Sequence, residues 1–105
     1  MDHLAIRTAI FSIGINNAPA PQPMEALSRF LEGISQHAAH LTGPLQYVKQ
    51  LDYREYDTSL QAATYQLRFE HGTLLVQLSC LTSRELWEIS QLHWGSTSPR
   101  MAIAS

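Results

Sequence analysis

The sequence predicts an α+β fold in which one long helix packs on a curved antiparallel sheet, in the order β-α-β-β-β-β. Residues 24–41 have the spacing of an amphipathic helix, residues 45–94 alternate between apolar and polar positions, and a proline-rich linker precedes both. A helix with one apolar stripe laid across a meander is a stable two-layer arrangement. The length of 105 residues indicates one domain, 1–105.

The first apolar segment, Leu4 to Ile15, is rich in isoleucine. Because β-branched residues favour a pleated surface, we interpret residues 1–15 as an N-terminal strand, with a first helix as the alternative. The segment is too short to span a membrane. It has the outline of a signal peptide, but Asp2 stands where a positive charge belongs and Pro21 follows the expected cleavage site. We therefore expect a cytoplasmic protein.

Residues 16–23 (NNAPAPQP) form a proline-rich linker, because prolines prevent regular hydrogen bonding and stiffen the chain. The helix predicted after it has one continuous apolar stripe, made of Leu27, Phe30, Leu31, Ile34, Ala38 and Leu41. Gly43-Pro44 ends it. Gly33 lies inside the helix, and we expect it to permit close approach to the sheet.

The sheet is predicted from alternating runs after residue 44. A strand covers 45–56, and Tyr65, Leu67 and Phe69 alternate with polar residues in the next one. His71-Gly72 suits a tight hairpin turn, because glycine accepts positive φ. The register then sets Leu74, Val76, Leu78 and Cys80 over the same core as the first alternating set.

The last run, 86–94, is predicted as a strand with Trp87, Ile89, Gln91 and His93 on one face. A helix is the alternative, because Thr82 to Glu85 fits a capping box and Gly95 fits a helix C-cap. As a helix, however, its apolar residues spread over more than half of the circumference. Residues 24–98 thus hold the helix and the meander, and residues 99–105 are a tail.

The composition argues against several classes of function. Nine acidic and seven basic residues give a net charge of −2 with no basic run, so nucleic acid is not an expected partner, nor is a membrane. Charged residues make up only 15% of the chain, which is compatible with burial in an oligomer. The single cysteine, Cys80, lies between apolar neighbours and is interpreted as a buried, inert thiol.

Two short stretches resemble the cystatin-like and NTF2-like group of folds. Gly43-Pro44-Leu45 is similar to the entry into the meander of small NTF2-like domains. Trp87-Glu88-Ile89, followed by His93 and Ser96, resembles the "W-x-I … H-x-x-S" close of SnoaL-like members. The resemblance covers Met24 to Ser98 and implies a helix on a curved meander. The chain departs from full-length members in lacking clear paired N-terminal helices. It also lacks the Gln-x-Val-x-Gly loop of inhibitory cystatins, so protease inhibition is not implied.

Candidate chemistry is sparse. His37 and His40 are one helical turn apart, but no carboxylate or cysteine at suitable spacing completes a metal site, so exposed polar residues are the simpler interpretation. Asp52 and Glu55 alternate to opposite faces, which indicates a solvated acidic edge. We predict no metal and no cofactor.

The candidate ligand-binding residues are Tyr47, Tyr65, Gln91 and His93. If Trp87 and Ile89 point into the core, Gln91 and His93 follow them and line a cavity under the helix, with the two tyrosines facing it. A histidine there could act as a general base. The simpler interpretation is that tyrosine and histidine cap a filled core.

The sheet face away from the helix is predicted to carry mixed, mostly neutral residues: Val48, Thr64, Gln66, Arg68, Leu75, Gln77 and Ser79. Such a face can pair with a second copy, so we expect a homodimer through the sheet. The leading hypothesis is a non-catalytic binding or assembly module. The alternatives are a small pocket enzyme of the isomerase or cyclase type with His93 as base, and an accessory protein that binds another protein. A small apolar molecule is a further possible partner.

Overall fold

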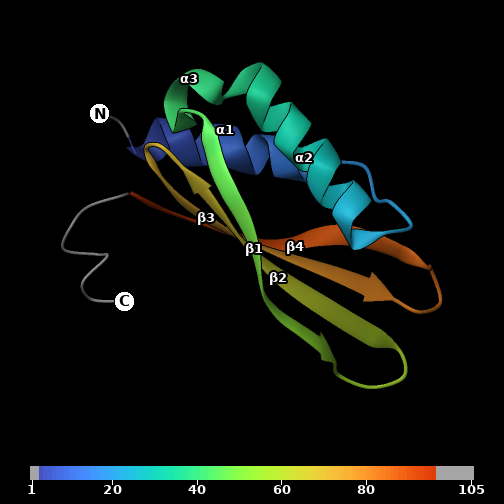
Figure 1. The fold of residues 1–105 in the computed structure, drawn as a ribbon. Helices are drawn as coiled ribbons and strands as arrows, with labels where there is room; N and C mark the ends of the chain where they lie inside the picture. Colours follow the sequence, from blue (N-terminus) through green and yellow to red (C-terminus); the bar gives the residue numbers. More distant parts are fainter. Residues whose placement is uncertain (1–2, 97–105) are drawn as a thin grey trace.

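The computed structural model describes residues 3–96 and has two layers, helices on one face of an antiparallel sheet (Figure 1). The elements are α1 (His3–Ile15), α2 (Pro23–His37), α3 (Ala39–Thr42), β1 (Leu45–Glu55), β2 (Leu60–Phe69), β3 (Gly72–Leu81) and β4 (Leu86–Ser96). The four strands follow one another across the sheet in chain order. The α+β class with an antiparallel sheet is confirmed; the tail predicted at 99–105 lies outside the described residues.

The N-terminal segment predicted as a strand is a helix, so the order begins α-α and the strand prediction for residues 1–15 is wrong. Ile6 and Ile10 are one turn apart and fully buried, and Ala9 and Ile13 pack against the same core. That spacing of three and four residues belongs to a helix face. Burial against α2 and β4 therefore outweighs the β propensity of isoleucine.

The long helix predicted over 24–41 is interrupted. α2 begins at Pro23 and ends at His37, and Ala38 takes a non-helical conformation with φ −136° and ψ 8° before the single turn of α3. The predicted stripe still faces the core, with Leu27, Phe30, Ile34 and Ala38 buried. The break therefore changes the direction of the chain without exposing the apolar face.

Gly33 has a different neighbour from the one predicted. A Cβ atom placed on Gly33 would lie 2.8 Å from Cγ2 of Ile13, which belongs to α1. The glycine therefore permits close approach of two helices, and the expectation that it faces the sheet is wrong. α1 and α2 lie side by side over the sheet (Figure 1).

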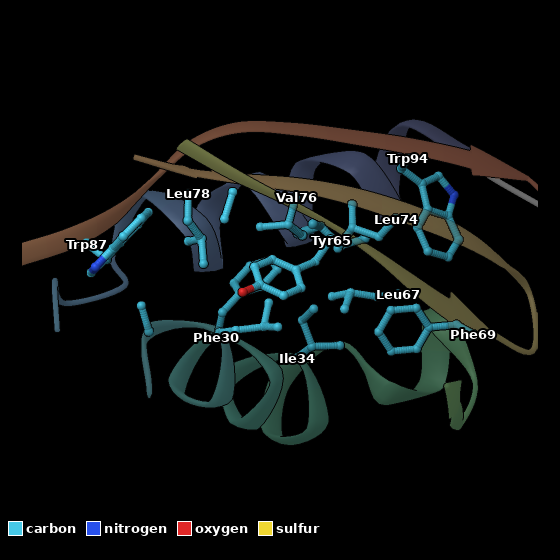
Figure 2. Packing of buried hydrophobic residues seen from close by; sticks show 14 of the residues in the cluster. Phe30, Ile34, Tyr65, Leu67, Phe69, Leu74, Val76, Leu78, Trp87 and Trp94 are labelled. Atoms are coloured by element: carbon cyan, nitrogen blue, oxygen red, sulfur yellow. The ribbon is translucent and has the colours of Figure 1, made fainter. Parts of the chain in front are cut away.

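The β2–β3 hairpin buries the predicted faces, but its register is shifted by two positions from the one that a His71-Gly72 turn would set. Leu67 pairs with Leu74 and Tyr65 with Val76, and all four are buried. The two turn residues are Glu70 and His71, one position before the predicted turn, since Phe69 pairs with Gly72. Figure 2 shows Phe30 and Ile34 of α2 opposite the side chains of this hairpin.

β4 is extended, as predicted, but it contains a β-bulge. Gln77 pairs with Gln91 and Leu78 with Ile89, so Ser90 has no partner residue on β3. The Ser90 hydroxyl donates to the Gln77 carbonyl at 3.1 Å. One extra residue inverts the alternation of a strand. As a result, Leu92 and Trp94 face the helices, whereas Gln91 and His93 face away.

β1 differs from the other strands because all eleven of its residues are exposed. Its register with β2 shifts twice, at Gln46 and at Leu51. Within residues 3–96, β1 pairs with β2 on one side and with no strand on the other. It is therefore an open edge of the sheet (Figure 1).

Candidate interaction surface

The four predicted ligand-binding residues do not converge. Tyr65 lies in the core on the helix-facing, inner face of the sheet and is only 4% exposed. Tyr47 pairs with Arg68, and its hydroxyl accepts a hydrogen bond from Gln66 Nε2 at 3.0 Å on the opposite, outer face. Gln91 and His93 also lie on the outer face. The expectation that all four surround a cavity under the helix is wrong, because bulges at Gln46 and Ser90 shift the alternation.

The core under α2 is filled where the sequence predicted a cavity. Phe30 and Ile34 meet Tyr65, Leu67 and Val76 there (Figure 2). A pocket of 330 Å³ lies beside this core, between α2, α3 and the start of β1. It is lined mainly by apolar groups, and none of the four predicted residues reaches it.

His93 and Gln91 instead line an open depression of 440 Å³ on the outer face, together with Thr64, Leu75, Gln77 and Leu92. Both side chains are exposed to solvent. This depression lacks the buried walls that concentrate a small ligand and exclude water. Ligand binding by these two residues stays a prediction.

A larger hollow of 520 Å³ lies between α1 and α2 and includes Asn17, Arg29 and His37. Arg29 donates to the Pro19 carbonyl at 3.1 Å and to Glu25 at 3.0 Å. Asn17 Nδ2 donates to the Ala26 carbonyl at 3.3 Å. These polar groups therefore hold the proline-rich linker against α2. In the described part of the chain, no three metal-ligating side chains gather at one place, here or elsewhere.

Cys80 is buried on β3, as predicted. Burial raises the pKa of its thiol, and the negative charge of Glu85 adds to the effect. The thiolate is the reactive form of cysteine, so both influences lower its reactivity. The thiol faces Trp87 across the β3–β4 pair, inside the apolar core.

The most unusual surface of the molecule is β1. Large apolar side chains are exposed along the strand and in the turn after it: Leu45, Tyr47, Val48, Leu51, Tyr53 and Tyr56, each between 38% and 56% exposed. We call these six residues the β1 surface. Val48 pairs with Leu67 and Tyr53 with Ala63, which places both on the inner face, whereas Tyr47 is on the outer face. The β1 surface therefore extends over both faces of the sheet and along its open edge.

Charged residues on β1 balance one another. Arg54 Nε lies 2.7 Å from Asp52 Oδ2, and both side chains are about half exposed. Lys49 is on the same outer face, opposite Gln66, and forms no ion pair with any residue from 3 to 96. Within residues 3–96, β1 thus carries one ion pair, Asp52–Arg54, and one cation without an ion-pair partner, Lys49.

Sequence reasoning missed this surface because it assigned one face of the strand to the core. Lys49 is the signal that could have revealed it, since a lysine in the apolar alternation of residues 45–53 is incompatible with a buried face. Two bulges place Lys49 and Tyr47 on the outer face and Val48 and Tyr53 on the inner one. The helices leave both faces of β1 exposed.

Comparisons of the chain with family models, with curated proteins and with solved structures find no match. The function is therefore argued from the geometry of the chain itself. None of the helices within residues 3–96 has the length and apolar content needed to cross a bilayer.

Proposed function

We propose that the chain is a small, non-catalytic binding or assembly module that acts as a homodimer. The observation that carries this proposal is the β1 surface on an edge strand that is unpaired on one side within residues 3–96. An open edge presents unpaired N–H and C=O groups, and natural proteins protect such edges or pair them with another chain. A low content of charged residues, 15%, adds little repulsion against a second copy.

The interface expected from the sequence was the outer face of the sheet. That face carries mainly polar side chains in its centre, such as Thr64, Gln66 and Gln77, and they are partly exposed. Exposed apolar area is greater on β1, and burying apolar area is the main driving force of association. These observations favour an interface that includes β1.

No observation favours the pocket-enzyme alternative. Such an enzyme would use His93 as base and Tyr47 or Tyr65 as hydrogen-bond donor. Tyr65 lies on the opposite face of the sheet from His93, and Tyr47 shares the outer face but lies on β1, at the other edge of the sheet from β4. The accessory-protein alternative needs an apolar patch apart from the dimer contact. The candidate for such a patch is on α1, where Phe11 and Ile15 are exposed. Both residues line a hollow of 240 Å³ between α1 and β4.

We also propose, as expected from the sequence, a relationship to cystatin-like and NTF2-like folds and a cytoplasmic location. Support for the relationship comes from a helix followed by a four-stranded meander. α1 and α2 pack against each other, so the chain has a pair of N-terminal helices, as NTF2-like proteins do.

Sedimentation velocity of the full chain at tens of micromolar tests the homodimer directly. We expect a species with twice the chain mass of 11.8 kDa. A monomer throughout this concentration range would overturn the proposed function.

A further inference from the structure

We propose that two copies pair β1 with β1 in antiparallel fashion, about a twofold axis between Gln50 and Leu51, so that Lys49 of each copy lies opposite Asp52 of the other. The inference depends on the proposed homodimer and specifies its partner, a second copy, and its register. The two four-stranded sheets would then form one continuous sheet.

The first argument is the direction of the backbone groups of β1. The Tyr56 N–H donates to the Leu60 carbonyl of β2 at 2.9 Å. In an antiparallel pair alternate residues direct both backbone groups to the same neighbour, and the residues between them direct theirs to the other side. The bulge at Leu51 shifts this alternation by one residue. The open edge therefore presents the backbone groups of Val48, Gln50, Tyr53 and Glu55.

This shift restricts how β1 can pair with itself. Two residues that face the open edge must lie opposite each other for the hydrogen bonds to form. An uninterrupted strand pairs with itself through residues an even number of positions apart. The bulge at Leu51 adds one residue, so two edge-facing residues on opposite sides of it are an odd number of positions apart. Val48 and Tyr53 are such a pair.

Side-chain direction selects the same register. Val48 and Tyr53 are both on the inner face, so they would bury apolar surface against each other across the axis. The same register sets Lys49 opposite Asp52 and Tyr47 opposite Arg54, all on the outer face. Each contact occurs twice because the axis is twofold.

Charge then excludes the neighbouring register. Moving the strands by two positions sets Lys49 opposite Arg54 and Val48 opposite Glu55. Like charges would then meet directly across the strands, twice in each dimer, and such pairs are destabilising. The lysine that has no ion-pair partner among residues 3–96 gains one only in the first register.

The helices are compatible with this arrangement. A twofold axis perpendicular to the sheet keeps both helical layers on the same face of the joined sheet. α1 and α2 pack against β4, at the far side of each sheet from β1 (Figure 1). Two uncovered β1 strands would separate the two helical layers.

Charge reversal tests the register. Lys49→Glu and Asp52→Lys each turn two attractive contacts into two repulsive ones, so each should raise the dimer dissociation constant about tenfold or more. The double variant K49E/D52K restores opposite charges and should return to within about threefold of the original chain. Arg84→Glu, in the β3–β4 turn, makes the same change of charge as Lys49→Glu; it is the matched control for that variant and should have no effect.

Sedimentation equilibrium gives the dissociation constants, and circular dichroism checks that every variant is folded. A dimer that is insensitive to both single reversals would overturn the register and leave the homodimer standing. Weakening by both single variants without recovery in the double variant would also overturn it. A monomeric original chain would overturn the homodimer and the register together.

Discussion

The two edges of the sheet have equal lengths and opposite environments. β4 and β1 each contain eleven residues. The edge of β4 is covered at Trp87 by its own chain, because Ala20 and Trp87 exchange two backbone hydrogen bonds, of 3.0 and 2.7 Å. α1 and α2 pack against β4, and its Trp87 and Trp94 are buried. β1 has no such cover within residues 3–96. The comparison indicates that the proline-rich linker protects one edge at Trp87, while the other edge is open within the described residues.

The largest difference between the two edges should appear in stability. Trp94 is 2% exposed, and its ring lies 6.1 Å from that of Phe69. Trp94→Ala should lower the free energy of unfolding by about 3–5 kcal/mol, because it leaves a large cavity. Tyr53→Ala on β1 should cost about 1 kcal/mol or less in the isolated chain. Urea denaturation at low protein concentration measures both.

Trp94→Phe is the matched control for this comparison. The indole N–H of Trp94 is buried and has no hydrogen-bond partner among the described residues. Phenylalanine keeps most of the ring and removes that donor, so the loss should be clearly smaller than for alanine. Equal losses for Trp94→Ala and Tyr53→Ala would contradict the contrast between a covered and an open edge.

A smaller effect is expected from uncovering β4. Ala20→Pro removes the N–H that donates to the Trp87 carbonyl at 3.0 Å, which should cost about 1–3 kcal/mol. The uncovered edge should also promote species larger than a dimer, visible in sedimentation velocity. Ala20→Gly keeps the N–H and serves as control. Unchanged stability and assembly in Ala20→Pro would show that the linker does not protect this edge.

The smallest effect concerns alkaline pH. Burial raises the pKa of Tyr65 above its ordinary value of 10.0, and the negative charge on nearby Tyr53 adds to the effect. Above about pH 10 the unfolded chain loses this proton first, so folding stability falls as the pH rises. Tyr65→Phe should make the decline between about pH 9 and 11 less steep, whereas Tyr56→Phe, at an exposed position, should not. The measurement is the urea midpoint of unfolding of each variant across this pH range. If the midpoint falls with pH equally steeply in Tyr65→Phe and in the original chain, the decline does not come from Tyr65.

Part of the fold is readable in the sequence because burial leaves a periodic pattern. The faces that β2 and β3 bury follow from the alternation at Tyr65, Leu67 and Phe69, whereas the turn lies one position earlier than the glycine suggested. The stripe of α2 is equally clear. The helix α1 was missed because its isoleucines favour a strand by propensity, whereas burial of Ile6 and Ile10 against α2 and β4 favours a helix.

The candidate site could not be predicted because it depends on bulges. Ser90 and Leu51 each add one unpaired residue, which leaves composition unchanged and reverses which side chains face the core. One of these bulges moved His93 out of the expected cavity. The other determines in which register β1 can pair with itself. The homodimer stays a prediction, and its expected contact is now the β1 edge of the sheet instead of the sheet face.

Amide hydrogen exchange of β1, followed by NMR at high and low protein concentration, tests the central claim most directly. The account predicts that the amides of Val48 and Tyr53 exchange at least about tenfold more slowly in the concentrated sample, because they donate to a second copy there. Arg54, whose backbone faces β2, should change far less. Rapid exchange of Val48 and Tyr53 at every concentration, in a chain that sediments as a dimer, would contradict it.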